Sequence, residues 1–194
     1  NYPSSFMASV LSSDMDNTDK VVLNIRECHR LKIEIMPPDI NRSNYKFIAI
    51  NESEIRYGIG AIKGMGKGII EAIIEERGKG EFSSLGDLCR RMISHRLNKR
   101  LLEIMVKSGL LDCFVIAREV LLSQIEIALK IAEQGRLAVE QGQTDLFGLE
   151  INPGGEIDSK IDGENLVPQN WTSLEILKAE KEVLGYFLSG HPLD

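Results

Sequence analysis

The sequence predicts a mostly α-helical fold with a small α+β patch at its N-terminal end. Apolar residues recur at helical spacing through residues 58–140, whereas residues 31–57 change to the shorter period of strands. Residues 142–170 hold five glycines and two prolines with little periodicity, which indicates a linker before one last helix. With 194 residues, of which 43% are hydrophobic and 27% charged, the chain has the composition of a globular protein.

Residues 1–57 are expected to form two helices followed by three short strands. The first helix begins at Pro3, and Asn17 or Thr18 caps the second. The apolar faces of these helices consist of Phe6, Met7, Val10, Leu11, Val21, Val22, Ile25 and Cys28. The strands are expected at residues 31–36, 46–50 and 55–57.

Residues 58–140 predict a series of helices joined by tight, glycine-bearing turns. The helices are expected at residues 59–63, 67–77, 83–92, 98–107 and 116–140. Beyond the linker at residues 141–170, the segment 171–194 predicts one more helix. Thr172 and Glu175 have the spacing of a capping box at its start, and Trp171 is placed to pack on Ile176.

The turn around Gly64 and Gly66 has the pattern of a helix-hairpin-helix. The glycines permit positive φ and the close approach of another backbone, while Met65 is expected to point inward. The first amides of the following helix lack intrahelical partners and lie at the positive end of its dipole, which suits a phosphate oxygen. An ordinary helix–helix turn is the alternative. The candidate DNA-binding residues here are Lys63, Gly64, Met65, Gly66, Lys67 and Gly68.

Residues 83–107 repeat the helix–turn–helix layout without the two glycines. Although the net charge of the chain is −6, residues 89–107 hold six Lys and Arg against one Glu, including Arg90 and Arg91. A tandem pair of turns spans the minor groove and grips both strands through phosphates, without reading bases. For the basic residues alone, a solvated helix face is the alternative. The candidate DNA-binding residues of this second turn are Arg96, Asn98, Lys99 and Arg100.

A short peptide at the head of the linker is a second candidate binding element; it consists of Gln143, Thr144, Asp145, Leu146 and Phe147. Leu146 and Phe147 would serve as apolar anchors in a pocket of a partner, and Gln143 would hydrogen-bond at the rim. Two large apolar side chains in an acidic, Gly-flanked linker are costly unless something covers them. The alternative is that both pack on helices of this chain.

The sequence offers no candidate catalytic or metal-binding residue. Polymerase chemistry needs clustered carboxylates that hold two Mg²⁺, but Asp14 and Asp16 fit a capping loop and Asp39 fits a turn. The three cysteines lack metal-ligand spacing, which favours buried thiols in a reduced, cytosolic protein. No apolar run reaches the roughly 18–20 residues of a membrane span. There is no signal peptide, and we expect both ends to be internal to a longer protein.

The chain resembles the family of bacterial replicative DNA polymerase III alpha subunits, in register over essentially its whole length. The segments that carry the resemblance are SDMDNTDK (13–20), MPPDIN (36–41), GIGAIKGMG (58–66) and LGYFLSGHPL (184–193). The resemblance implies four parts. They are the end of the fingers domain (1–57), a tandem helix-hairpin-helix DNA-binding domain with a long helix (58–140), a linker carrying the clamp-binding peptide (141–170), and a helix leading to an oligonucleotide-binding domain (171–194).

The resemblance also implies an activity and partners. The parent protein would be a DNA-directed DNA polymerase that uses Mg²⁺, and this fragment would bind duplex DNA and dock the sliding clamp without catalysis. Through the parent, a proofreading exonuclease and a clamp loader would be further partners, in the cytoplasm and away from membranes. Two rival functions are a nuclease or ligase with paired hairpins, for which no carboxylate or lysine cluster is found, and a protein scaffold, against which the basic residues 89–107 argue.

Overall fold

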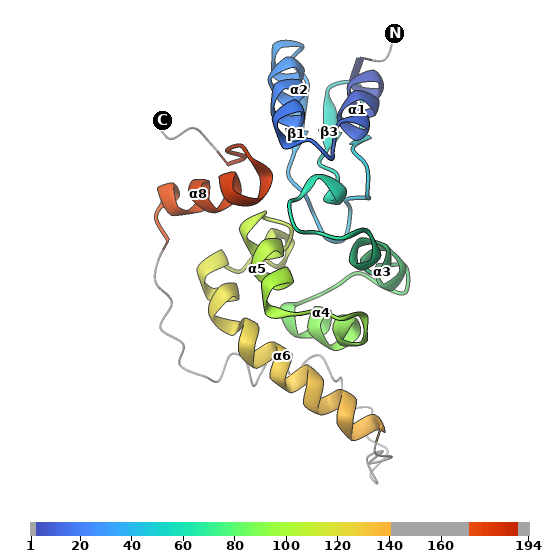
Figure 1. The fold of residues 1–194 in the computed structure, drawn as a ribbon, viewed down its shortest axis with the longest axis vertical. Helices are drawn as coiled ribbons and strands as arrows, with labels where there is room; N and C mark the ends of the chain where they lie inside the picture. The colour runs from blue at the N-terminus through green and yellow to red at the C-terminus, as the bar shows by residue number, and fades with distance from the viewer. Residues whose placement is uncertain (1–2, 141–170, 190–194) are drawn as a thin grey trace.

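Two helices and a three-stranded sheet make up the N-terminal part of the computed structural model, which describes residues 3–140 and 171–189. The helices α1 (Pro3–Ser13) and α2 (Thr18–Arg30) pack beside the strands β1 (Glu34–Met36), β2 (Ile48–Ala49) and β3 (Glu54–Arg56) (Figure 1). The strand order is β1-β3-β2, with β1 parallel and β2 antiparallel to β3. Ile35 lies opposite Ile55 in this sheet. The predicted α+β patch is confirmed, although β1 and β2 are shorter than expected and β3 begins one residue earlier.

The local signals of this patch are largely confirmed. Asn17 is the residue that caps α2, because its Oδ1 accepts a hydrogen bond from the Lys20 amide at 3.1 Å. Phe6 was expected on the apolar face of α1 but is 68% exposed. The buried face of α1 includes Met7 and Leu11, as expected, but Ser4 and Ala8 take the places expected for Phe6 and Val10.

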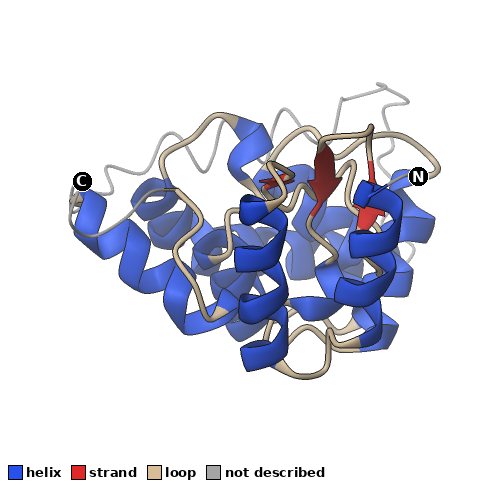
Figure 2. Cartoon of the chain, turned by 90° about the horizontal axis from the view of Figure 1, so that it is seen from above, coloured by secondary structure: helices blue, strands red, loops and turns tan. Residues whose placement is uncertain are grey.

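The middle of the chain is helical, as predicted. Its elements are the 3-10 turn η1 (Ile59–Ala61), α3 (Lys67–Arg77), α4 (Leu85–Met92), the 3-10 turn η2 (Ile93–His95), α5 (Lys99–Lys107), the 3-10 turn η3 (Asp112–Phe114) and the long helix α6 (Arg118–Glu140). Figure 2 shows the few short strands within a body otherwise made of helices and loops. Within the described ranges, no helix is both long and apolar enough to cross a membrane.

The helix expected at residues 59–63 is wrong, because only the three-residue turn η1 forms there. The amide of Ile59 donates to the Asn44 carbonyl and that of Gly60 donates to the Tyr45 carbonyl, each at 2.9 Å. A Cβ at Gly58 would lie 2.7 Å from the carbonyl carbon of Lys46. Ile62 then has an extended backbone (φ −75°, ψ 122°), and the Lys63 amide, which an α-helix would direct to the Ile59 carbonyl, donates to the Val183 carbonyl at 2.9 Å instead. The segment is therefore held against the preceding loop by its first amides and leaves the helical conformation after η1.

Helix α8 (Ser173–Leu184) packs back onto the body rather than standing apart from it (Figure 1). The predicted capping box is confirmed, since Thr172 and Glu175 each hydrogen-bond the backbone of the other. Gly185 ends the helix with φ +83°, and a Cβ there would lie 2.2 Å from Cγ2 of Thr18. One hydrophobic core joins the described elements and includes side chains from Met7 of α1 to Leu184 of α8. The division into the four parts given above stays a prediction.

Candidate nucleic-acid interface

The first predicted turn is built around Gly64 and Met65. Gly64 has φ +86°, the left-handed conformation that a side chain disfavours. Met65 is 7% exposed, so the expectation that it points inward is confirmed. A Cβ on Gly64 would lie 2.6 Å from Cδ1 of Ile104, which belongs to α5. The first turn therefore rests directly on the second helix pair, and the positive φ at position 64 favours glycine there.

The start of α3 is open to solvent. Gly66 is the N-cap, with an ordinary extended backbone (φ −75°, ψ 151°) and no side-chain hydrogen bond to the first amides of the helix. A Cβ built at Gly66 or at Gly68 would meet nothing within 4 Å. Nothing inside the described part of the chain thus requires glycine at these two positions. What their hydrogens allow is close approach from outside, to amides at the positive end of a helix dipole.

The second turn differs from the first because its helix is already capped. Arg96 ends η2 in the left-handed conformation, with φ 62°. Asn98 then accepts a hydrogen bond from the Leu101 amide at 3.0 Å through Oδ1, and Leu97 is buried. The Asn98 side chain is thus engaged in holding α5, and one amide that a phosphate would take is occupied.

The predicted cations have different surroundings. Lys99 hydrogen-bonds Glu126 of α6, a contact that raises the pKa of Lys99. Nζ of Lys67 lies 3.7 Å from a carboxylate oxygen of Glu71 on an exposed surface, and so weak an ion pair does not fix the lysine side chain. Lys63, Arg96 and Arg100 are exposed, and none makes an ion pair in the part of the chain that the structure describes. Lys63, Gly64 and Arg100 line one pocket together, so the structure brings the two turns to a common surface.

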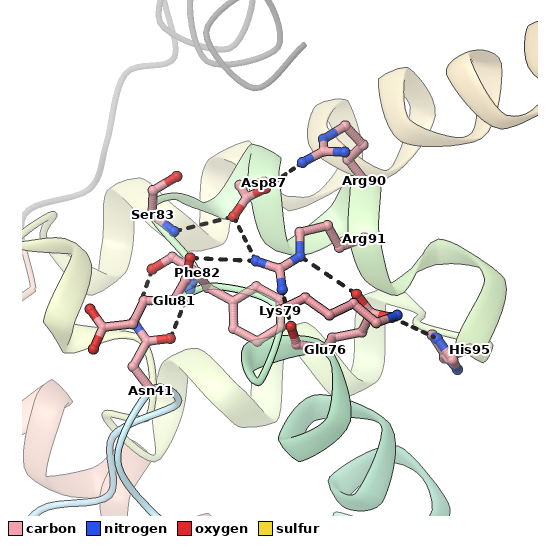
Figure 3. Close-up of polar contacts among 10 residues, drawn as sticks. All are labelled: Asn41, Glu76, Lys79, Glu81, Phe82, Ser83, Asp87, Arg90, Arg91 and His95. Atoms are coloured by element: carbon pink, nitrogen blue, oxygen red, sulfur yellow. Dashed lines mark hydrogen bonds and ion pairs between the residues drawn. The ribbon is translucent and has the colours of Figure 1, made fainter. Parts of the chain in front are cut away.

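The two basic residues of α4, Arg90 and Arg91, both pair with carboxylates of the protein. The side chain of Arg91 is 13% exposed and lies over the Phe82 ring, 4.3 Å from its centroid (Figure 3). Its guanidinium contacts Glu76 by a 3.6 Å ion pair and Asp87 by a 3.3 Å one. Arg90 also pairs with Asp87, at 2.7 Å. The guanidinium of Arg91 is therefore engaged by carboxylates of the protein itself, although the residue belongs to the basic stretch 89–107.

This network fixes α4 on the end of α3. Arg91 also donates to the backbone carbonyl of Glu76, and His95 of η2 lies 3.8 Å from the Glu76 carboxylate (Figure 3). The hydrogen bond from Lys79 lowers the pKa of Glu76, and the charges of Lys79 and Arg91 lower it further, against the effect of burial. Glu76 therefore stays ionised, and its contacts with Arg91 and His95 hold the end of α3 against α4 and η2.

Asn41 ties this network to the N-terminal patch. Its Nδ2 donates to the Phe82 carbonyl at 2.9 Å, and its Oδ1 accepts from the Phe82 amide at 2.8 Å (Figure 3). Sequence reasoning treated residues 37–41 as a turn and missed this contact. Its only sequence signal is an amide side chain next to a turn, which specifies no distant partner.

A buried ion cluster joins α8 to the same body. Arg118 makes two hydrogen bonds to Asp112, at 2.9 and 2.6 Å, and one to Glu180 of α8, at 3.1 Å. Glu180 is fully buried and also accepts from the amides of Leu188 and Ser189, at 2.7 and 2.9 Å. Close to this cluster, the amide of Lys63 donates to the Val183 carbonyl at 2.9 Å. Helix α8 thus supports the first turn directly.

Two further predictions concern the clamp-binding peptide and the binding of metal ions. The peptide at residues 143–147 lies outside the described residues. Within residues 3–140 and 171–189, no group of three or more His, Cys, Asp or Glu side chains is placed to hold a metal ion.

Comparison with known proteins agrees with this geometry. A family model described as the helix-hairpin-helix motif matches residues 32–121, which include both turns. DNA polymerase III subunit alpha of Escherichia coli K12 is 44% identical over all 194 residues, and that of Vibrio cholerae is 41% identical. Over its full length, this chain is similar to one segment of DNA polymerase III subunit alpha. The resemblance drawn from the sequence is confirmed.

The segment is a small part of those relatives. The chain spans 16% of the E. coli and V. cholerae DNA polymerase III alpha subunits. The Pseudomonas aeruginosa protein is 39% identical over 209 aligned residues, and 18% of its length is covered. The shared segment contains the two turns and α8.

Proposed function

We propose that residues 58–107 bind the backbone of duplex DNA without sequence preference, as part of a bacterial replicative DNA polymerase. The observation that carries this proposal is the open start of α3, where Gly66 and Gly68 leave the first amides accessible. Lys63 and Arg100 add positive charge from both turns. Amides and cations of this kind contact phosphates, which position a protein on DNA but carry no sequence information.

The test is the salt dependence of binding to a short duplex. Each phosphate neutralised by Lys or Arg steepens the fall of log K against log salt by about 0.9. We expect a slope of several units and equal affinities for duplexes of unrelated sequence. A flat salt dependence, or a strong preference for one sequence, would contradict a phosphate grip.

We propose further that residues 143–147 dock the sliding clamp. The support is the pattern itself: Gln143, two spacer residues, and the apolar pair Leu146 and Phe147 in a Gly- and Pro-rich segment. Burying each anchor is worth about 1.5–3 kcal/mol, and ordering five residues costs several kcal/mol. The net is a contact of roughly micromolar strength, which becomes firm when DNA supplies a second attachment. A pull-down with a bacterial sliding clamp tests it.

For the parent protein, we propose DNA-directed DNA polymerase activity in the cytoplasm, with the proofreading exonuclease and the clamp loader as partners. The support is the similarity to the DNA polymerase III alpha subunits. Mg²⁺, which we propose for that activity, is assigned to no residue of this chain. A primer-extension assay on the parent protein, with and without Mg²⁺, tests this proposal.

A further inference from the structure

A pocket of about 520 Å³ lies where the first turn, α5 and α8 meet. Five charged residues line it. Lys63 comes from the turn, Arg100, Glu103 and Lys107 from α5, and Glu182 from α8. Two of these, Lys63 and Arg100, are the exposed cations that the two turns bring together.

One cation of the pocket is already neutralised within the protein. Nζ of Lys107 lies 3.0 Å from each of the two carboxylate oxygens of Glu182. The side chain of Lys107 is only 25% exposed, whereas that of Glu182 is 62% exposed. In contrast, Lys63, Arg100 and Glu103 make no ion pair with any described residue. Lys107 thus lies in the wall of the pocket, and the Glu182 carboxylate that pairs with it is the more solvent-exposed partner.

We infer that this pocket binds one phosphodiester group of duplex DNA, and that Glu182 occupies the third cation until DNA arrives. A carboxylate that offers two oxygens to one ammonium group imitates the two non-bridging oxygens of a phosphodiester. A phosphate entering beside Lys63 and Arg100 competes with Glu182 for Lys107. This inference rests on the proposed DNA binding and adds to it a negative regulator carried by α8.

The competition does not require α8 to leave. Glu180 stays buried against Arg118, and the Val183 carbonyl keeps the Lys63 amide. Only the exposed Glu182 side chain has to rotate away, and such surface pairs are worth little to stability. A substitution at position 182 therefore tests the electrostatics of the pocket without unfolding the chain.

The decisive variant is Glu182→Gln, measured on the 194-residue chain by fluorescence anisotropy with a labelled duplex over a range of salt. An exposed ion pair is worth up to about 1 kcal/mol, so we expect binding to tighten about two- to fivefold. The slope of log K against log salt should steepen by about 0.9, because one more cation reaches a phosphate. In the double variant Lys107→Met with Glu182→Gln, both gains should be lost.

The control is Glu103→Gln, which removes the same charge from the same pocket without freeing Lys107. Any tightening of DNA binding by Glu103→Gln measures only the general effect of removing one negative charge. The same tightening should therefore be seen when Glu103→Gln is combined with Lys107→Met. If the gain of Glu182→Gln also survives Lys107→Met, or if Glu182→Gln gives no gain, the inference is wrong while the proposed DNA binding stands. If the wild-type chain shows no salt-dependent duplex binding, the proposed function itself fails.

Discussion

Replacing Gly66 with valine separates the fold of the first turn from its contact with DNA. The backbone of Gly66 has φ −75° and ψ 151°, which valine adopts readily, and a Cβ there meets nothing within 4 Å. The one local cost is that valine is a poorer N-cap than glycine. We put this cost at about 1 kcal/mol or less, which lowers the melting temperature by about 2–4 °C in a chain of this size.

The expected loss of DNA binding is much larger. A hydrogen bond from a backbone amide to a charged group contributes about 1.5–3 kcal/mol. If the valine side chain keeps a phosphate from the amides of α3, the dissociation constant should rise by about 10- to 150-fold. Neutral amides release no counterions of their own, so the salt slope should stay as in the wild type. In contrast, replacing Lys63 or Arg100 with alanine should lower the slope by about 0.9 each.

Anisotropy titrations at several salt concentrations, with thermal melts of the same samples, decide the matter. Gly135→Val is the matched control, because a Cβ at Gly135, near the far end of α6, also meets nothing within 4 Å. That variant should bind duplex as the wild type does. A folded Gly66→Val protein with unchanged affinity would refute the assignment of the α3 amides to a phosphate.

Three further changes probe other parts of the chain. Gly64→Ala should destabilise the fold by about 1–2 kcal/mol in urea titrations, because of the positive φ at this position; a neutral effect would show that the backbone of the turn adopts another conformation without cost. Glu180→Gln should cost about 1–3 kcal/mol, because Arg118 keeps its two hydrogen bonds to Asp112 but a buried oxygen that accepts from Arg118 or from the amides of Leu188 and Ser189 is replaced by an NH2 group; a fully stable variant would show that this cluster contributes little to stability. Replacing both Leu146 and Phe147 with alanine should abolish clamp binding and leave duplex affinity intact; clamp binding that survives would place the contact elsewhere.

The features that could be predicted from the sequence are those with local causes. The capping box of Thr172 and Glu175 depends on residues three apart, and the inward position of Met65 follows from a turn of four residues. The amphipathic helices from α3 to α6 could be predicted for the same reason, because the spacing of their apolar residues is visible in each segment by itself. In each case the interaction that decides the structure lies within a few positions along the chain.

The features that were missed depend on distant partners. Arg91 belongs to a basic stretch in the sequence, and only the fold shows that Glu76 and Asp87 surround it. The 3-10 turn at Ile59 forms in place of a longer helix because the Lys63 amide donates to the distant carbonyl of Val183 and not to that of Ile59. Charge density along the sequence therefore overestimated the number of cations that are free to meet DNA.

The two turns provide different groups for the proposed contact with DNA, and contacts within the protein already fix them relative to one another. The first turn offers open amides, whereas the second has its helix capped by Asn98 and offers the exposed cations Arg96 and Arg100. The Arg91 network and the contact of Gly64 with α5 hold both turns in one body. Little ordering then remains to be done on binding, which leaves more of the contact energy as affinity. Because α8 supports the first turn through Val183, we expect the proposed contact with DNA to depend on residues far downstream in the sequence.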